Sequence, residues 1–525
     1  MEDREIEKIG FQNDKEQFSS NSLFMEEKTM GKDKKKIVIV GGGIAGLSAG
    51  IYGKLAGYDV DIYEKNPVAG GQCMGWNRKG CHIDNCIHWL TGTKKGTTLR
   101  KVWETVGALD EHTEFADCDS FYTSTKGDSQ VTLWKDLERT KSELLKLSPV
   151  DAMEIEKFIE HVKYAAECEI PAEKPMDAMG IMDYIHMGVS MANMPKVMRE
   201  YGSIDLEELS TRFKHPVLKQ MFTDYLPKEY VASSFLVSYA SITSGNGEIP
   251  MGGSLAMVNR MVNRFLQLGG NLHCNTPVLQ ILIENKKAIG IEIADKKRVL
   301  ADYIISSVDT MEMFGRLIGK KYMDTKWQSC YADNEKYPLF SAVQAAFMVD
   351  QEAYDRKGTI FFDCSPFETG GKKVERISVK SYEYEPKFAP TGKIVIQVNV
   401  PQFDKEYLYW KGLTSEEYES RKKEAVKAIE ERLQMQFPSL QGHMVFLDCW
   451  TPITYERYCN AYHGAYMGFI TRKGVKSFRV KGLLKGVQNL YIASQWIMAP
   501  GGLPVAVTAG KFAVWRIARK DKRTS

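Results

Sequence analysis

Residues 37–64 read IVIVGGGIAGLSAGIYGKLAGYDVDIYE, and this stretch decides the fold. Residues 37–40 are apolar and β-branched, as is typical of a buried parallel strand. A glycine-rich turn leads into a helix expected from about Ile44 to Leu55, which keeps small residues and is closed by Gly57. A second strand, 59–63, ends in Glu64. The stretch therefore predicts a strand, a turn, a helix and a second strand that form one parallel unit.

The turn contains the pattern G-x-G-x-x-G at Gly41, Gly43 and Gly46. In such a unit the first glycine permits the tight turn, the second lets the backbone approach a pyrophosphate, and the third lets the helix pack on the strand. The amide N–H groups at the start of the helix would then face the phosphate. The turn therefore predicts a dinucleotide site.

The carboxylate at the end of the second strand indicates which kind of ribose the site accepts. Glu64 lies 18 residues after Gly46, where a carboxylate can accept both ribose hydroxyls of an adenosine. A 2′-phosphate would be repelled there, which disfavours NADP. The pattern up to this point leaves both FAD and NAD open.

Composition sets wider limits. The chain has 525 residues, of which 43% are hydrophobic and 26% charged, so more than one core and two domains are expected. The net charge of +3 is too small to indicate a nucleic-acid partner. Ten cysteines show no C-x-x-C pair and no accompanying histidine pair, so we expect no metal and a reduced, cytoplasmic protein.

No targeting or membrane-spanning segment is expected. Residues 1–36 are rich in charge and serine and lack the apolar stretch of a secretory signal, so they are interpreted as a flexible arm. No apolar stretch reaches the roughly 18 residues of a membrane span. The basic tail, 520–525, and the basic residues just before it could still aid contact with anionic lipid at the inner face of a membrane, although such a tail is more often a solvated helix end. These basic residues are Arg516, Arg519, Lys520, Lys522 and Arg523.

A second glycine turn separates FAD from NAD. Lys65, Gly70, Gly71 and Gln72 follow the acidic strand directly, and this arrangement resembles the second turn of the amine oxidase and phytoene desaturase flavoprotein superfamily. In that family the second turn lies against the phosphates and the flavin. The resemblance therefore implies FAD as the cofactor.

Three later segments carry the same resemblance, in the family's order. Residues 250–254 and 268–278 resemble the passage that returns the chain to the FAD domain, where Val278 would meet the adenine through its backbone. Residues 451–468 resemble a "T-P … G-x-x-[YF]-x-G" region, and 489–504 the closing "N-L-Y-x-A-G-[DQ]-W … P-G-G-G-x-P" element. Ser494 and Gln495 depart from the family's usual Gly and Asp. Gln495 can still hydrogen-bond a ribityl hydroxyl or the pyrophosphate.

The residues expected to bind FAD are Gly41, Gly43, Ile44, Ala45, Gly46, Glu64, Lys65, Gly71, Gln72, Val278, Gln495, Pro500, Gly501, Gly502 and Leu503. The resemblance implies an α/β fold with a discontinuous, Rossmann-like FAD-binding domain and an α+β substrate domain built on a mixed sheet covered by helices. The FAD-binding domain is expected from residues 37–95, 245–310 and 480–519. The substrate domain is expected from residues 96–244 and 311–479.

The substrate domain offers fewer signals. Residues 342–349, 358–362, 376–381 and 393–400 are strand-like, and Thr414 with Glu417 predicts a capped helix. Seven methionines lie between Met176 and Met198, and four of them recur at helical spacing. They could form a flexible wall for a long apolar ligand or a membrane-surface mouth, or they could simply fill a core.

The nearest resemblance is to the bacterial phytoene desaturase and retinol saturase branch. It implies an FAD-dependent oxidoreductase that desaturates or saturates carbon–carbon bonds of a long apolar substrate such as an isoprenoid, carotenoid, retinoid or other lipid. No second nucleotide fingerprint follows a strand, so electrons would pass to or from oxygen, a quinone, another carrier or transiently bound NAD(P)H. A redox-neutral isomerase, an amine oxidase and a non-catalytic prenyl-lipid binder remain alternatives.

Two histidines are candidate catalytic residues. His88 follows the second glycine turn and could titrate near neutrality, and His463 lies within a run of tyrosines. A packing role is the alternative for each. Cys459 is a conceivable covalent attachment point for the flavin, although its surroundings do not match the known attachment motif well.

Overall fold

Strand β1 (Lys36–Val40) forms the centre of a five-stranded parallel sheet, and its residues 37–39 are completely buried. The computed structural model describes residues 34–524, of which 35 onward form one unit, so the expected arm over 1–36 lies mostly outside the described residues. The strand order is β19-β13-β1-β2-β9, and every pairing is parallel. The other four strands are β2 (Asp59–Tyr63), β9 (Asn271–His273), β13 (Tyr303–Ser306) and β19 (Leu490–Ile492).

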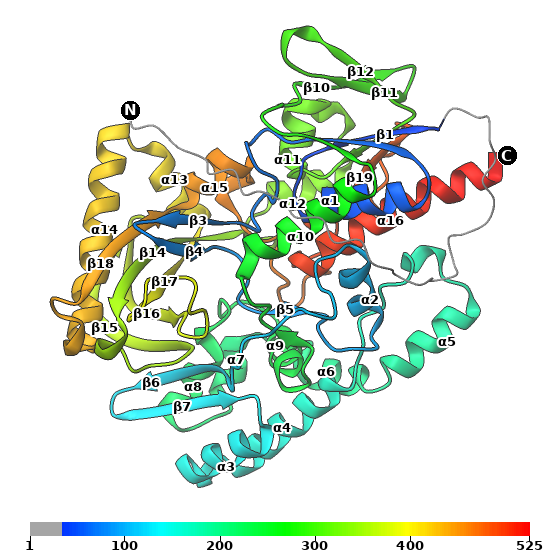
Figure 1. Cartoon of the computed structure of the whole chain (residues 1–525). Helices are drawn as coiled ribbons and strands as arrows, with labels where there is room; N and C mark the ends of the chain where they lie inside the picture. Colours follow the sequence, from blue (N-terminus) through cyan, green and yellow to red (C-terminus); the bar gives the residue numbers. More distant parts are fainter. Residues whose placement is uncertain (1–33, 525) are drawn as a thin grey trace. The chain divides into compact units, whose positions relative to one another are not determined.

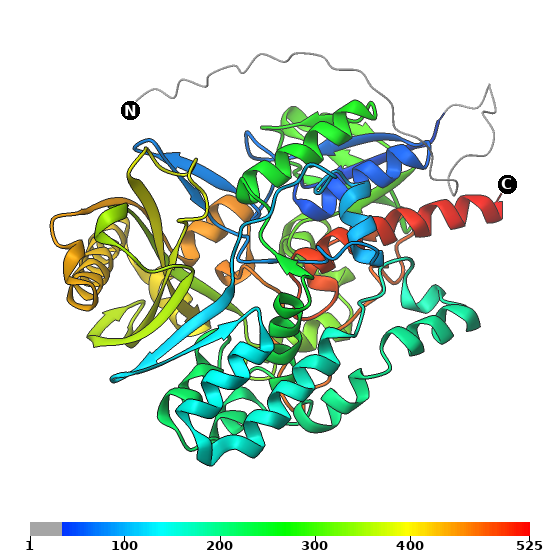
Figure 2. The same cartoon turned by 60° about the horizontal axis from the view of Figure 1, so that its bottom comes forward.

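Helices pack closely on this sheet because small residues face one another. Helix α1 (Ile44–Leu55) lies beside the C-terminal helix α16 (Leu503–Thr524), as Figures 1 and 2 both show. A Cβ on Gly510 of α16 would lie 2.4 Å from the Ala45 carbonyl oxygen. Helix α10 (Gly253–Gln267) packs on α1 as well, and Phe265 fills the space above Gly50. Helix α16 runs on through residues 520–524, so the expected basic tail is helical.

A seven-stranded mixed sheet forms the second large element. Its order is β18-β14-β17-β16-β15-β6-β7, antiparallel except where β15 pairs with β6. The strands are β6 (Ser120–Lys126), β7 (Ser129–Trp134), β14 (Phe340–Asp350), β15 (Thr359–Thr369), β16 (Lys372–Ser381), β17 (Lys393–Phe403) and β18 (Met444–Trp450). The four strands predicted in 311–479 are confirmed as β14 to β17.

Helix α14 (Ser415–Gln436) packs against the apolar face of this sheet. It begins with the predicted capping box, in which the Thr414 hydroxyl accepts from the Glu417 N–H and the Glu417 carboxylate accepts from the Thr414 N–H. Ile429 and Leu433 of α14 are completely buried against the sheet. Helices α13 (Asp404–Gly412), α15 (Pro452–Cys459), α12 (Thr325–Ala332) and α11 (Thr310–Glu312) complete the second half of the chain.

Small sheets and hairpins complete the strands. The hairpin β3 (Gly75–Arg78) and β4 (Cys81–Asp84) follows β2, and β5 (Leu90–Thr91) pairs with β8 (Gly247–Glu248). A three-stranded antiparallel sheet comprises β10 (Gln280–Glu284), β11 (Lys287–Glu292) and β12 (Arg298–Leu300).

The segment between β7 and β8 is helical and packs around an aromatic core. Helices α4 and α9 lie against each other, and Phe158 and Tyr239 stack between them. Figure 2 shows these helices (cyan to green) gathered beside the strands of the seven-stranded sheet. The helices of this half are α2 (Thr98–Thr105), α3 (Leu137–Leu147), α4 (Ala152–Ala166), α5 (Ile181–Ser190), α6 (Met194–Tyr201), α7 (Leu206–Thr211), α8 (Pro216–Asp224) and α9 (Ala232–Thr243).

The methionine stripe is divided between two helices. Met187 lies on α5 and Met198 on α6, and residues 191–193 form the turn between them. Met198 is 47% exposed, and α5 buries none of its residues. The alternative that these methionines fill a core is therefore wrong for α5 and for Met198.

The predicted fold class is confirmed: a Rossmann-like parallel sheet accompanies a mixed sheet covered by helices. Strands β1 and β2 come from residues 37–95, β9 and β13 from 245–310, and β19 from 480–519. The strands of the mixed sheet come from 96–244 and 311–479. Among residues 34–524, no helix combines the length and the apolar character needed to cross a membrane.

Candidate functional site

The first and third glycines of the turn satisfy the protein's own packing. Gly41 has φ +100°, and a Cβ there would lie 2.8 Å from the Ser307 hydroxyl oxygen. A Cβ on Gly46 would lie 2.0 Å from the Gly41 carbonyl oxygen, so helix α1 can approach β1 only with glycine at this position. These two residues therefore set the shape of the turn.

The second glycine leaves space instead. Gly43 has an ordinary φ of −73°, and the nearest atom to a Cβ there would be the Gly70 carbonyl oxygen at 3.9 Å. Helix α1 begins at the next residue with no side-chain cap and no acidic residue in its first turn. The N–H groups of Ile44, Ala45 and Gly46 have no carbonyl partner within the helix. Open space beside unpaired amides is what a pyrophosphate requires.

Glu64 lies at the carboxyl end of β2, where it is 5% exposed. One carboxylate oxygen accepts from the Gly42 N–H at 2.8 Å, and the other accepts from the Asn66 N–H at 2.9 Å. A carboxylate has about four acceptor positions. Glu64 is thus held in place by two backbone amides while retaining acceptor capacity for two ribose hydroxyls.

The second glycine turn packs on the first. The Gly70 N–H donates to the Gly42 carbonyl at 2.9 Å, and a Cβ on Gly71 would lie 3.3 Å from Gly43 Cα. Gln72 follows, and its amide donates to the Ala465 carbonyl at 2.8 Å. The two turns therefore form a continuous backbone surface.

The closing segment joins this surface from the other end of the chain. Gly501 has φ +88°, and a Cβ there would lie 2.9 Å from the Gly468 nitrogen. The Gly502 N–H donates to Gln495 Oε1 at 2.9 Å, immediately before α16 begins. Gln495 Nε2 donates to Gln72 Oε1 at 3.2 Å and contacts the Tyr466 carbonyl at 3.4 Å. Gln495, expected to hydrogen-bond a cofactor, already has protein partners for its amide.

One cavity of about 990 Å³ connects these segments with the mixed sheet. Every residue expected to bind FAD lines it except Gly46, which packs behind the turn. The Val278 carbonyl accepts from Arg316 at 2.9 Å, and the Lys65 ammonium donates to the Arg457 carbonyl at 3.1 Å. Beyond the glycine turns the lining becomes aromatic, with Trp89 and Tyr225 at 5.5 Å between ring centres. The cavity thus has a glycine-rich end, which is the predicted nucleotide end, and an aromatic part, here called the aromatic chamber.

A hydrogen-bond network joins several residues of the cavity lining. The Tyr455 hydroxyl accepts from Gln344 Nε2 at 2.8 Å and from Trp450 Nε1 at 3.0 Å, and it donates to Asn85 Oδ1 at 2.8 Å. Tyr455, Gln344 and Asn85 all line the cavity. The sequence placed Tyr455 in a tyrosine run but gave no signal for Gln344, which lies 111 positions earlier in the chain.

His88 lines the cavity, but the prediction that it titrates near neutrality is wrong. Burial, with a smaller contribution from the positive charge of Lys380, lowers its pKa from 6.5 to about 3. The imidazole is therefore neutral at physiological pH, and it makes no side-chain hydrogen bond within residues 34–524. It can pack against a ligand or accept a hydrogen bond, but it does not supply a proton at neutral pH.

His463 is not brought to the cavity. Its Nδ1 lies 2.6 Å from Asp404 Oδ1, and its ring stacks between Tyr407 and Tyr462 at centroid distances of 4.6 and 4.0 Å. These contacts are those of a packing histidine. Its position does not support a catalytic role.

Cys459 lines the cavity near Lys65. Burial raises the pKa of its thiol from 9.0 to about 12, against a smaller opposing effect of Lys65. A protonated thiol is a poor nucleophile. The environment of Cys459 therefore disfavours a covalent link to a flavin.

Lys380 is a cavity residue that sequence reasoning missed. It lies on β16, is 7% exposed, and faces the same space as His88. Alternating polar and apolar residues in a strand usually indicate one solvent-facing side, so no local pattern reveals that this polar side is buried.

The profile of the flavin-containing amine oxidoreductase family matches residues 44–518. A 4,4′-diaponeurosporene oxygenase from Staphylococcus haemolyticus is 22% identical over 508 residues, covering 91% of this chain and 96% of the relative. A lycopene-forming phytoene desaturase from Paracoccus sp. is 22% identical, with the same coverage of both chains. The crystal structure of cyclohexylamine oxidase from Brevibacterium oxydans superposes with a TM-score of 0.54 at 13% identity, covering 93% of this chain and all of the other.

Proposed function

The chain belongs to the flavin-containing amine oxidoreductase family, and from this premise we propose that it is an FAD-dependent oxidoreductase acting on carbon–carbon bonds of a long, largely apolar substrate. The observation that carries the proposal is the single cavity that runs from the two glycine turns to an aromatic chamber. A cofactor and an apolar chain can share this space.

FAD fits the nucleotide end better than a nicotinamide dinucleotide. Glu64 retains acceptor capacity for an adenosine ribose, and Gly43 leaves room beside the unpaired amides of α1 for the pyrophosphate. A second backbone surface, from Gly71 to Gln72, also lines the cavity and would lie against the rest of a longer cofactor. Gln495 and the start of α16 would lie along the ribityl chain. When bound, FAD supplies hydride-transfer chemistry.

The chain's own residues bind, orient and exclude water. Trp89, Tyr225 and Phe361 form part of an apolar wall on which a conjugated or isoprenoid chain can lie. The Tyr455 hydroxyl is fixed by three hydrogen bonds, so it provides a rigid polar point in the cavity lining. The relatives named for carotenoid oxidation and desaturation support a substrate of this class.

We also propose contact with a membrane surface through α5. Ile181 and Val189 are 81% and 74% exposed, and α5 buries no residue. Figure 1 shows α5 at the edge of the fold. Met198 on the next helix, α6, is exposed and also lines the cavity, so a lipid-soluble substrate could pass from this surface to the chamber. Exposed Lys196 and Arg199 on α6 would favour anionic lipid.

The electron partner of the proposed oxidoreductase is oxygen, a quinone or transiently bound NAD(P)H.

Amine oxidation is the second candidate, because one aromatic pair favours it. Tyr455 and Tyr466 both line the cavity with ring centres 5.8 Å apart and planes inclined by 48°. The exposed face of either ring could bind a protonated amine through a cation–π contact. Peroxide production that depends on an added amine would support this candidate over the first.

The test begins with the purified protein's spectrum and with mass analysis of lipid extracted from it. We expect absorbance of an oxidised flavin that acid precipitation releases. In the absence of air, photoreduced protein is then mixed with polyenes and enones, and oxidised protein with saturated isoprenoids. Flavin reoxidation with a saturated product, or reduction with a desaturated product, supports the proposal. Products with no net electron transfer indicate an isomerase, and colourless protein indicates a lipid binder; either result overturns the proposal.

A further inference from the structure

The mixed sheet turns a polar face toward the cavity although that face is buried. On β16 and β17 the residues alternate: Ile377, Val379, Ile396 and Val398 join the apolar core that packs on α14. The residues on the cavity side are Gln344, Ser378, Lys380, Gln397 and Asn399. Lys380 pairs with Gln397, and Asn399 pairs with both Ser378 and Gln344 across neighbouring strands. These five side chains form one continuous patch, here called the polar patch.

A polar surface is unexpected in a chamber for a pure hydrocarbon. Lys380, Gln397 and Gln344 are 7%, 5% and 4% exposed. Burying an amide or an ammonium costs free energy unless its hydrogen bonds are satisfied. What each group already bonds therefore decides what the patch can bind.

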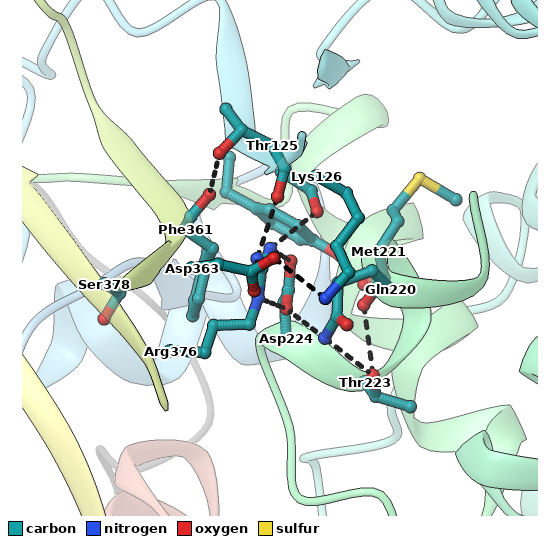
Figure 3. Close-up of polar contacts among 12 residues, drawn as sticks. Thr125, Lys126, Gln220, Met221, Thr223, Asp224, Phe361, Asp363, Arg376 and Ser378 are labelled. Carbon is teal, nitrogen blue, oxygen red and sulfur yellow. Dashed lines mark hydrogen bonds and ion pairs between the residues drawn. The ribbon is translucent and has the colours of Figure 1, made fainter. Parts of the chain in front are cut away.

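Arg376, two residues before Ser378 on the same strand, is already saturated (Figure 3). Its Nε and Nη2 donate to the two oxygens of Asp224 at 2.6 and 2.7 Å. Its remaining hydrogen bonds reach the Thr125 carbonyl at 2.8 Å, Asp363 at 2.9 Å and the Ser124 hydroxyl at 3.0 Å. These contacts use all five donors of a guanidinium. Arg376 therefore joins α8 to the sheet and has no donor left for a ligand.

Lys380, four residues after Arg376, still has unused hydrogen-bond donors. Its ammonium makes one hydrogen bond, to the Ile87 carbonyl at 3.2 Å, and lies 4.6 Å from the centre of the Tyr382 ring. It has no ion-pair partner within the described part of the chain. Burial lowers its pKa, while Asp84 acts in the opposite direction. An ammonium has three donors, so two remain for a ligand.

The neighbouring amides of Gln397 and Asn399 have oxygens that receive no hydrogen bond. Gln397 Nε2 donates to the Asp84 carbonyl at 2.9 Å, which fixes the orientation of the amide. Gln397 Oε1 and Asn399 Oδ1 are buried and accept no hydrogen bond within residues 34–524. Leaving a buried acceptor unpaired costs about 1–3 kcal/mol. The patch thus presents free donors on Lys380 beside free acceptors on the two amides.

We propose that the substrate carries a hydroxyl group, whose oxygen accepts from Lys380 and whose hydrogen is donated to the amide oxygen of Gln397 or Asn399. This inference rests on the proposed function and narrows its substrate class to a long-chain alcohol. A hydrocarbon would leave donors and acceptors unpaired. A carboxylate could satisfy Lys380 but not the amide oxygens, and the charges of Asp84, Glu383 and Glu385 close to Lys380 would oppose it.

The experiment compares three ligands of equal chain length on the holoenzyme: geranylgeraniol, the matching C20 hydrocarbon without the hydroxyl, and geranylgeranoic acid. Binding is followed by the change in flavin fluorescence. A site built to hydrogen-bond a hydroxyl discriminates strongly against an analogue that lacks it, so we expect the alcohol to bind about a hundredfold more tightly than the hydrocarbon. The acid should bind more weakly than the alcohol.

Variants test which residues provide the discrimination. Lys380→Met should bring the affinity for the alcohol close to that for the hydrocarbon and leave the hydrocarbon unaffected. Asn399→Leu should weaken alcohol binding by about tenfold, and it provides a second test if Lys380→Met does not fold. Lys372→Met is the matched control, because Lys372 lies on the same strand and also lines the cavity. It should leave the preference for the alcohol intact.

Equal binding of alcohol and hydrocarbon, tighter binding of the hydrocarbon, tighter binding of the acid, or no binding of any of the three overturns the inference. The proposed function fails on different observations, namely the absence of flavin or the absence of lipid-dependent electron transfer. A protein that reduces a polyene hydrocarbon but ignores the hydroxyl would therefore retain its proposed function and refute this inference.

Discussion

The side-chain amide of Gln495 donates to the side-chain oxygen of Gln72 across 3.2 Å, although 423 positions separate them in the sequence. Gln72 ends the second glycine turn, and Gln495 precedes the turn that begins α16. The same Gln495 accepts from the Gly502 N–H at 2.9 Å. One side chain thus holds the first and last segments of the proposed FAD site, here called the cofactor cradle, in register.

Replacing Gln495 by Leu should weaken FAD binding without unfolding the protein. The Gly502 N–H loses its acceptor, and the Gln72 side chain loses a restraint, so the flavin end of the cradle loosens. We expect the Kd for FAD to rise about tenfold, equivalent to about 1.4 kcal/mol, as measured by flavin fluorescence titration of the apoprotein. Gln441→Leu, at an exposed glutamine outside the cavity, is the control. An unchanged Kd would show that Gln495 does not support the cradle.

Two glycines of the turn, Gly43 and Gly46, should behave differently when replaced by Ala. At Gly43 an added methyl meets no protein atom closer than 3.9 Å, so the stability of the apoprotein should hardly change, while the Kd for FAD rises at least about tenfold. At Gly46 the methyl would lie 2.0 Å from the Gly41 carbonyl oxygen, which should cost at least about 3 kcal/mol of stability. Denaturant unfolding of both apoproteins measures the difference. Loss of stability in Gly43→Ala would contradict the idea that this space belongs to a ligand.

The nucleotide end of the site could be predicted from sequence because local rules fix it. The apolar strand at 37–40, the glycine spacing and Glu64 each constrain the backbone nearby, and the structure gathers these residues at one cavity. The strands of the mixed sheet followed from β-branched and aromatic residues in the same way.

The substrate end could not be predicted because its contacts are long-range. Gln344 and Tyr455 meet only after the sheet has folded, and the alternation of Ser378 and Lys380 with apolar residues reads equally as a solvent-facing side. The tyrosines around His463 in the sequence suggest a catalytic histidine, but in the structure aromatic rings stack on His463 away from the cavity. The regular spacing of the methionines indicated one helical surface and did not reveal the turn at 191–193 that separates α5 from α6.

Replacing Arg376 by Met should destabilise the protein strongly. The side chain of Asp224 is completely buried and would lose its partner for two hydrogen bonds. Removing one member of a buried ion pair costs about 3–5 kcal/mol, which denaturant unfolding would detect. The double variant Arg376→Met with Asp224→Asn should recover part of this loss, because the unpaired charge is gone. Arg421→Met, which breaks an exposed pair with Glu424, should leave the stability nearly unchanged. A loss of similar size in both single variants would contradict this account.

His88 should make stability fall as the pH falls. Its pKa is about 3 in the folded protein and 6.5 when unperturbed, so between these values only the unfolded state binds the proton. Stability from this residue is therefore complete above pH 6.5 and decreases as the pH drops toward 3. Between pH 7 and pH 5, the wild type should lose about 2 kcal/mol more than His88→Leu does, as measured by denaturant unfolding. Identical pH dependence in both proteins would show that His88 is not buried in its neutral form.

The exposed helix α5 should determine binding to lipid. Ile185 is 51% exposed and Val189 is 74% exposed, so each can bury apolar surface in a membrane interface. Replacing either residue by Asp removes that gain and adds a charge that anionic lipid repels. We therefore expect the binding constant for phosphatidylcholine–phosphatidylglycerol vesicles, measured by co-sedimentation, to fall by at least about tenfold. Leu300→Asp, at a residue 64% exposed on β12, is the matched control and should leave binding unchanged. Equal losses in all three variants would indicate a general effect of charge, and unchanged binding in the α5 variants would place the lipid contact elsewhere.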